Sequence, residues 1–105
     1  MATTRKPTHP GCIIRHDYIE PLGLTVTGLA EHLGISRKHL SQVLHERSKV
    51  TSGLALRLAR AFNTTPELWL NLQRKVDLWE AERDTPDLDK VSPLPGVAED
   101  GTEAR

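Results

Sequence analysis

The amino-acid sequence predicts an all-α fold, in which a compact five-helix domain is followed by a disordered acidic C-terminal tail. Three observations support this prediction. In five segments before Glu82, apolar residues recur every three or four positions, bounded by capping residues, glycines or prolines. No segment shows the apolar–polar alternation of a β-strand. From Asp84 onward, prolines, glycines and acidic residues dominate, which is typical of disorder.

These observations divide the chain into three parts: a flexible N-terminus at residues 1–8, a helical domain at 9–83 and the tail at 84–105. The first helix is expected to begin at Pro10, because proline fits the first helical turn. It is expected to end near Glu20, because Pro21 and Gly23 follow. Its apolar face consists of Ile13, Ile14 and Tyr18.

The segment Val26–Glu46 predicts two short amphipathic helices joined by a tight turn at Gly34. Thr25 or Thr27 can cap the first helix and Ser36 can cap the second. Glycine suits the turn because it adopts the left-handed conformation that ends many helices. The apolar sides of the two helices consist of Leu29, Ala30, Leu33, Leu40, Val43 and Leu44.

The outer face of the second of these helices is polar and basic. A helix with such a face fits the major groove of DNA, where arginine, lysine, serine and glutamine side chains meet base edges and phosphates. The arrangement is a helix-turn-helix signature, so sequence-specific DNA binding is the leading hypothesis. The residues of this face are Ser36, Arg37, Lys38, Ser41, Gln42 and His45.

Two further helices complete the domain. Thr51 caps the fourth, whose apolar residues recur at helical spacing until Asn63. Thr65, Pro66 and Glu67 open the fifth with a cap, a first-turn proline and a first-turn acid. The fifth helix is apolar on more than one side, which predicts either a dimer interface or a single broad core face. The stripe predicted for the dimer interface consists of Trp69, Leu72, Val76 and Trp79.

Charge is distributed unevenly, although the net charge of the 105 residues is zero. Residues 1–83 hold 12 basic and 8 acidic residues, a net charge of +4, and residues 84–105 hold 2 and 6, a net charge of −4. Basic residues are concentrated around the motif, where DNA contact is predicted, although charged helix surfaces also serve solubility. They are Arg37, Lys38, Arg47, Lys49, Arg57 and Arg60.

Several classes of function have little support. No apolar run is long enough to span a membrane and no signal peptide is visible, so a cytoplasmic protein is expected. The single cysteine, Cys12, excludes an internal disulfide, and no neighbouring base marks it as a nucleophile. The five histidines do not have the spacing of a metal site. We therefore expect no enzyme activity, no metal and no cofactor.

The motif resembles the lambda-repressor-like, or XRE-type, helix-turn-helix family, with a small residue at Ala30 and the turn glycine at Gly34. Longer stretches resemble the HigA family of antitoxins, and the resemblance covers about His9 to Ala81. The WLNLQ stretch is its most specific part. The stretches are His9-Pro10-Gly11, Pro21-Leu22-Gly23-Leu24, Leu33-Gly34-Ile35-Ser36-Arg37, Ala55-Leu56-Arg57-Leu58-Ala59, and Pro66-Glu67-Leu68-Trp69-Leu70-Asn71-Leu72-Gln73 with Asp77-Leu78.

The resemblance implies a homodimer that binds a palindromic operator in double-stranded DNA and represses its own promoter. It also implies a toxin partner, a small basic RelE-like ribonuclease that the antitoxin keeps inactive. Two alternatives remain open at this point. One is a stand-alone transcriptional regulator of the same fold, and the other is a dimeric protein-interaction module that no longer binds DNA.

The sequence departs from the family pattern at four places. Cys12 replaces the usual acid after His-Pro-Gly, and Gly28 replaces the usual acid before the Leu-Ala pair. Val26 replaces a glutamine that contacts the DNA backbone, and Thr27 can take over that contact. His45 and Glu46 replace an Asn-Gly pair at the end of the recognition helix.

Arg37 is the leading candidate for a bidentate contact to guanine, and a phosphate contact is the alternative. Gln42 can pair with adenine or simply face solvent, and Ser36 caps its helix and can also touch phosphate. Arg47 and Lys49 are expected to bind phosphate, although Lys49 also suits a solvated loop. The complete predicted DNA-binding set is Thr27, Ser36, Arg37, Lys38, Ser41, Gln42, His45, Arg47 and Lys49.

Overall fold

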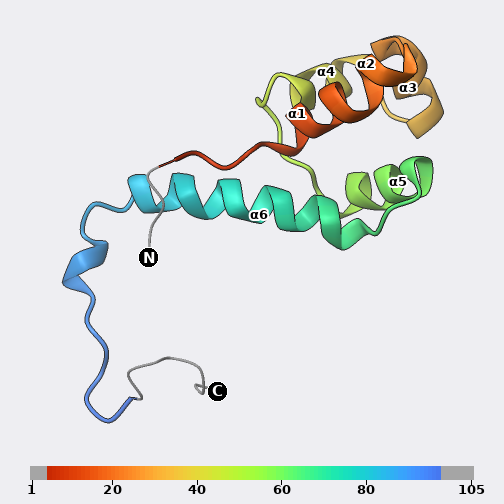
Figure 1. The fold of residues 1–105 in the computed structure, drawn as a ribbon. Helices are drawn as coiled ribbons and strands as arrows, with labels where there is room; N and C mark the ends of the chain where they lie inside the picture. The colour runs from red at the N-terminus through yellow and green to blue at the C-terminus, as the bar shows by residue number, and fades with distance from the viewer. Residues whose placement is uncertain (1–4, 98–105) are drawn as a thin grey trace.

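The computed structural model describes residues 5–97, and its secondary structure within that range is entirely helical. Helices α1 to α4 form one layer, which packs against α5 and α6 (Figure 1). Since α1, the π-helix η1 and α2 run on without a break, the domain has the five helices that the sequence predicts. The elements are α1 Pro10–Ile13, η1 Ile14–Ile19, α2 Glu20–Leu22, α3 Val26–Leu33, α4 Arg37–Leu44, α5 Ser52–Phe62, α6 Pro66–Arg83 and the 3₁₀ helix η2 Leu88–Lys90.

The first helix continues to Leu22, past the end predicted near Glu20. Its central part is wider than an α-helix, and the Glu20 N–H donates to the carbonyl of Arg15, five residues earlier. Proline has no N–H to donate and its ring crowds an α-helical turn, so a local change of turn width accommodates Pro21. Gly23, in the left-handed conformation at φ 65°, ends the helix instead.

Side-chain caps begin the four helices from α3 to α6, as predicted. Thr25, rather than Thr27, caps α3 by accepting a hydrogen bond from the Gly28 N–H at 2.9 Å. Gly34 ends α3 in the left-handed conformation at φ 76°. Helix α4 ends at Leu44, two residues before the predicted end. The remaining caps are Ser36 for α4, Thr51 for α5 and Thr65 for α6.

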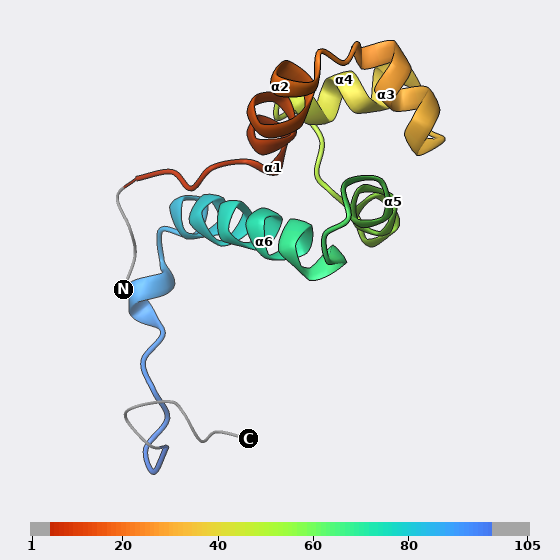
Figure 2. The same cartoon turned by 45° about the vertical axis from the view of Figure 1, so that its right-hand side comes forward.

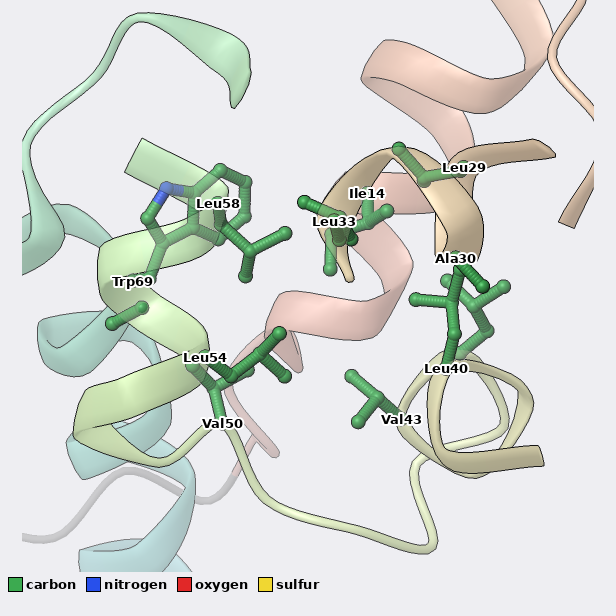
Figure 3. Close-up of a cluster of buried hydrophobic side chains, with 12 residues drawn as sticks. Ile14, Leu29, Ala30, Leu33, Leu40, Val43, Val50, Leu54, Leu58 and Trp69 are labelled. Carbon is green, nitrogen blue, oxygen red and sulfur yellow. The ribbon is translucent and has the colours of Figure 1, made fainter. Parts of the chain in front are cut away.

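One hydrophobic core joins the two layers, as Figure 3 shows. Trp69 from α6 is fully buried in it, and its indole N–H donates to the Thr64 hydroxyl at 2.8 Å. The rings of Tyr18 and Phe62 stack at 3.8 Å between centroids and close the core beside Trp69. Aliphatic side chains fill the rest of this core: Ile14, Leu29, Ala30, Leu33, Leu40, Val43, Leu44, Val50, Leu54, Ala55 and Leu58.

Gly11 brings the start of the first helix against the recognition helix α4. A Cβ atom added at this buried glycine would overlap the carbonyl oxygen of Val43 and lie 3.1 Å from the Cα of Leu44. Arg15, one turn later, donates from Nη1 to the Leu44 carbonyl at 3.5 Å. The first helix therefore supports the back of α4. The close approach at Gly11 is possible because glycine has no side chain.

The dimer stripe predicted on α6 is wrong for two of its four residues. Trp69 and Val76 have exposed fractions of 0% and 1% in the single chain, so they face the domain's own core. Leu72 and Trp79 are only half-buried. Leu68, which is 41% exposed, lies on the same side of the helix, because it precedes Leu72 by four residues. Leu68, Leu72 and Trp79 therefore form the outer apolar face of α6.

The tail leaves the far end of α6 and extends away from the domain (Figures 1 and 2). Residues 84–97 are all exposed, and η2 forms a short turn within a region predicted to be disordered. The rest of the predicted tail, residues 98–105, and the first half of the predicted flexible N-terminus, residues 1–4, lie outside the described residues.

The buried His9 makes stability depend on pH. Burial lowers the pKa of His9 below its ordinary value of 6.5, and the Glu46 and Glu80 carboxylates offset only part of that effect. In the folded chain, Nδ1 accepts a hydrogen bond from the Gly11 N–H at 2.9 Å and caps α1. As the pH falls below 6.5, the unfolded chain binds a proton before the folded chain does. The free energy of unfolding should therefore be constant above about pH 6.5 and decline between that pH and the folded pKa, by at most about 1.4 kcal/mol per pH unit.

Urea unfolding at several pH values between 4.5 and 8 measures this dependence. The variant His9→Asn keeps a capping oxygen but does not titrate, so its stability should lose this part of the pH dependence. The prediction would be contradicted by identical pH profiles for the two proteins.

Candidate DNA interface

The predicted DNA-binding residues lie along α4, on the loop that follows it, and at the start of α3. Eight of them are exposed, and the ninth, Ser41, is half-buried. The inner face of α4 is held in the core by Leu40, Val43 and Leu44, which are at most 3% exposed. The helix is thus fixed along one side while its polar side faces solvent. A helix presented in this way can enter a major groove with its first turn and outer side chains.

Thr27 and Arg37 come together across the helix-turn-helix. The Nε of Arg37 donates to the Thr27 hydroxyl at 3.1 Å, and both side chains are exposed. Arg37 is the first residue of α4, where side chains reach base edges most easily. Because the bond uses Nε, it fixes the guanidinium and leaves its two terminal nitrogens for a ligand. Thr27 therefore orients Arg37 on the surface of the helix-turn-helix.

We expect Thr27→Val to weaken binding to a specific operator by about fivefold, since one hydrogen bond contributes about 1 kcal/mol. The substitution preserves shape and removes only the hydroxyl, so binding to unrelated DNA should change little. Thr27→Ser, which keeps the hydroxyl, is the matched control and should bind as the wild type does. Equal affinities of the valine and serine variants in a mobility-shift titration would show that Thr27 does not position Arg37.

Gln42 organises the loop after α4. Its backbone carbonyl accepts hydrogen bonds from the N–H groups of Arg47 and Ser48 at 2.8 and 3.2 Å. Its side-chain Oε1 accepts from the Ser48 hydroxyl at 3.4 Å. This bond orients the amide and leaves Nε2 available as a donor to an acceptor on a base.

The side chains of His45 and Lys49 have partners within this chain. The Nδ1 of His45 donates to the Ser41 carbonyl at 2.8 Å, which folds the ring back onto its own helix. Lys49 forms an ion pair with Asp77 of α6 at 3.2 Å. Asp77 also accepts from Gln73, which in turn binds the Val50 N–H, so Lys49 belongs to the attachment of this loop to α6.

Glu46 occupies a backbone position that favours glycine, at φ 62°. Its carboxylate lies 3.7 Å from the ammonium group of Lys6, which also lies 3.8 Å from Glu80. The left-handed conformation costs a non-glycine residue about 1 kcal/mol, and an exposed ion pair offsets part of that cost at most. This strained position coincides with the departure from the family's Asn-Gly pair.

Arg57, which belongs to the basic cluster around the motif, has a structural role. Its Nη1 donates to the Leu33 carbonyl at 2.8 Å and lies against Gly34 in the turn. A cation at the C-terminus of α3 also interacts favourably with the helix dipole. Arg57 therefore ties α5 to the helix-turn-helix, a role that the sequence pattern did not distinguish from DNA contact.

Within residues 5–97, no group of three or more His, Cys, Asp and Glu side chains is placed to hold a metal ion. Among the same residues, no helix is both long and apolar enough to cross a membrane.

Comparison with known proteins identifies the family. A model of the helix-turn-helix family matches residues 16–69, which include α3, the turn and α4. The chain belongs to this family. Within the family the chain is of the HigA type. It is similar to antitoxin HigA-1 of Vibrio cholerae, with 38% identity over 74% of this chain and 73% of that protein.

Two further relatives of this HigA-type chain bear on function. YbaQ of Escherichia coli K12, an uncharacterised helix-turn-helix transcriptional regulator, is 44% identical over 91% of this chain and 85% of its own length. The solved structure of the antitoxin GraA in complex with its operator superposes with a TM-score of 0.81. It is 37% identical in sequence, and the match covers 93% of this chain and 99% of GraA.

Proposed function

We propose that this chain is a HigA-type antitoxin that acts in the cytoplasm as a homodimeric autorepressor. In this role it binds a palindromic operator near its own promoter and neutralises a small basic ribonuclease of the RelE-like class. The observation that carries the DNA-binding part is the exposed outer face of α4, on which Thr27 orients Arg37. The likeness to GraA, solved with its operator, supports the same conclusion.

Base recognition is assigned to Arg37 and Gln42, which offer oriented guanidinium and amide donors from successive turns of α4. Ser36, Lys38 and Arg47 are assigned to phosphate, which positions the domain on the duplex without reading sequence. Ser41, one turn after Arg37, and His45, at the C-cap of α4, are assigned polar contacts to DNA, which for His45 requires the ring to leave the Ser41 carbonyl.

The homodimer is assigned to the outer apolar face of α6, formed by Leu68, Leu72 and Trp79. Binding to a palindrome requires that the two-fold axis of this dimer turn both copies of α4 toward the same side of the DNA. Half-sites of the palindrome should then be about one helical turn apart, roughly 34–36 Å.

Binding of the purified protein to the DNA upstream of its own coding sequence tests this proposal. A mobility-shift titration should show a specific complex whose affinity falls steeply with salt, because phosphate contacts release counterions. A scrambled sequence of the same composition is the control. Equal affinity for the two DNAs would contradict an operator-binding function and favour a protein-interaction module.

A stand-alone transcriptional regulator is the second candidate. It is favoured by the 44% identity to YbaQ, which exceeds the 38% identity to HigA-1. Both candidates bind an operator as dimers, so DNA binding does not separate them. Only the antitoxin relieves the toxicity of a partner protein.

A further inference from the structure

An apolar groove with a cationic end lies between α3 and α5. One part, of about 490 Å³, is lined mainly by apolar residues of the α2–α3 turn, α3 and the end of α5. A second part, of about 470 Å³, shares His32 and Ala61 with the first and adds two arginines. Together they form what we call the α3–α5 groove. Its main lining residues are Leu22, Leu24, Leu29, Leu56, Arg60 and Phe62.

Two leucines of this groove have most of their surface exposed. Leu22 is 63% exposed and Leu56 is 60% exposed, although both line the groove. At its cationic end, Arg60 has an exposed side chain, whereas Arg57 is tied to Leu33. A ligand for this groove therefore needs apolar groups together with negative charge.

Residues 84–97, which we call the arm, have this chemistry. Four large apolar side chains recur at every third position and are between 47% and 75% exposed: Leu88, Val91, Leu94 and Val97. The same segment holds three acidic residues, Asp84, Asp87 and Asp89, and one basic residue, Lys90. A polyproline II or 3₁₀ segment has three residues per turn, so this spacing presents its apolar residues on one side.

The arm has local structure even though it does not pack on its own domain. The Thr85 hydroxyl donates to the Ala81 carbonyl at 2.7 Å, and the N–H groups of Leu88 and Val91 donate to Thr85 and Leu88 at 3.1 and 3.0 Å. These bonds direct the arm away from the core and leave its apolar side uncovered. An exposed apolar surface of this kind is typical of a site that binds another protein surface.

The position of the arm indicates a second copy of this chain as that partner. The arm begins at the C-terminal end of α6, and both views show this end far from α3 and α5 (Figures 1 and 2). Helix α6, with 18 residues, is about 27 Å long. In a dimer with antiparallel α6 helices, each arm would instead begin beside the partner's Pro66, which follows the groove residue Phe62 by only four positions.

We propose that the arm of each protomer docks in the α3–α5 groove of a second copy of this chain. The leucines and valines of the arm cover the apolar part of the groove, and the aspartates face Arg60. This inference rests on the homodimer of the proposed function and extends it to an exchange of arms. None of the groove residues belongs to the outer face of α4, so the arm and DNA are assigned different side chains.

Disulfide trapping between two differently tagged copies tests the proposal. Both copies carry Cys12→Ser. One copy also carries Leu56→Cys in the groove, and the other carries Leu94→Cys in the arm. Under mild oxidation the mixture should give a covalent heterodimer. The matched control replaces Leu56→Cys with Asp17→Cys, which is exposed but outside the groove, and it should give little product.

A second measurement compares dimer dissociation constants by sedimentation equilibrium. Removal of residues 84–105, and separately Arg60→Glu, should each weaken the dimer about tenfold or more, since buried apolar area and a charge contact are lost. Arg74→Glu, on the exposed surface of α6, is the control and should leave the constant unchanged. Asp87→Lys should restore part of the affinity lost in Arg60→Glu.

Absence of trapping, equal trapping at Asp17, or trapping only when both cysteines are on one chain would each overturn the exchange of arms. A dimer whose arms are not trapped would leave the α6 homodimer intact. A chain that stays monomeric at all concentrations would contradict the homodimer itself and the exchange with it.

Discussion

Arg37→Ala should lower the affinity for a specific operator by about 1–3 kcal/mol, roughly 5- to 150-fold, with little loss of binding to unrelated DNA. The expectation follows from the place of Arg37 at the first position of α4 and from its bond to Thr27, which orients the guanidinium. Fluorescence-anisotropy titrations on operator and scrambled DNA at one fixed salt concentration give both affinities.

Lys38→Ala is the matched comparison, because Lys38 is the exposed cation next to Arg37 and is assigned to phosphate. It should weaken binding to both DNAs by similar factors and reduce the salt dependence by about one counterion. If Arg37→Ala behaved as Lys38→Ala does, Arg37 would be a phosphate contact and the assignment of base recognition would be wrong.

Gly11→Ala should destabilise the folded chain by about 3 kcal/mol or more, the upper range for overpacking a core. The added methyl group would overlap the Val43 carbonyl, and backbone atoms on both sides cannot move away as a flexible side chain could. Urea unfolding followed by circular dichroism measures the change. Since α1 supports the back of α4, operator affinity should fall together with stability.

Gly53→Ala is the control for this prediction. Gly53 lies inside α5 with no atom within 4 Å of an added Cβ, so alanine should stabilise the helix by up to about 1 kcal/mol. A Gly11→Ala variant as stable as the wild type would show that α1 and α4 can separate at no cost.

The parts of this fold that could be predicted from sequence depend on neighbouring residues. Thr25, Ser36, Thr51 and Thr65 cap helices because their side chains bond the backbone three residues ahead. Gly34 ends α3 because glycine adopts positive φ without strain. Because such rules are local, they place the helix-turn-helix and its outer face, and with them the candidate DNA-binding residues.

Features that depend on distant segments could not be predicted. The spacing correctly predicted a helix with one apolar stripe, formed by Trp69, Leu72, Val76 and Trp79. Only the packed structure shows that Trp69 and Val76 face the core. The guanidinium of Arg57 could bind a DNA phosphate or the backbone carbonyl of Leu33, 24 residues away. Only the folded structure shows that it binds the carbonyl.

The strain at Glu46 has the same origin. Nothing in the local sequence favours a left-handed glutamate, and the path from α4 to α5 imposes it. The end of the first helix differs for a local reason: a wider turn accommodates Pro21, so the helix continues to Leu22.

A growth-rescue assay tests the central claim, that this chain is an antitoxin, most directly. The small reading frame beside the gene is expressed in a host cell with and without this chain, and with the Arg37→Ala variant as a control for indirect effects of DNA binding. The account predicts growth arrest that both the wild type and Arg37→Ala relieve, because neutralisation depends on contact with the toxin. A harmless neighbour, or arrest that persists when the folded chain is abundant, would contradict the antitoxin function and favour a dimeric transcriptional regulator.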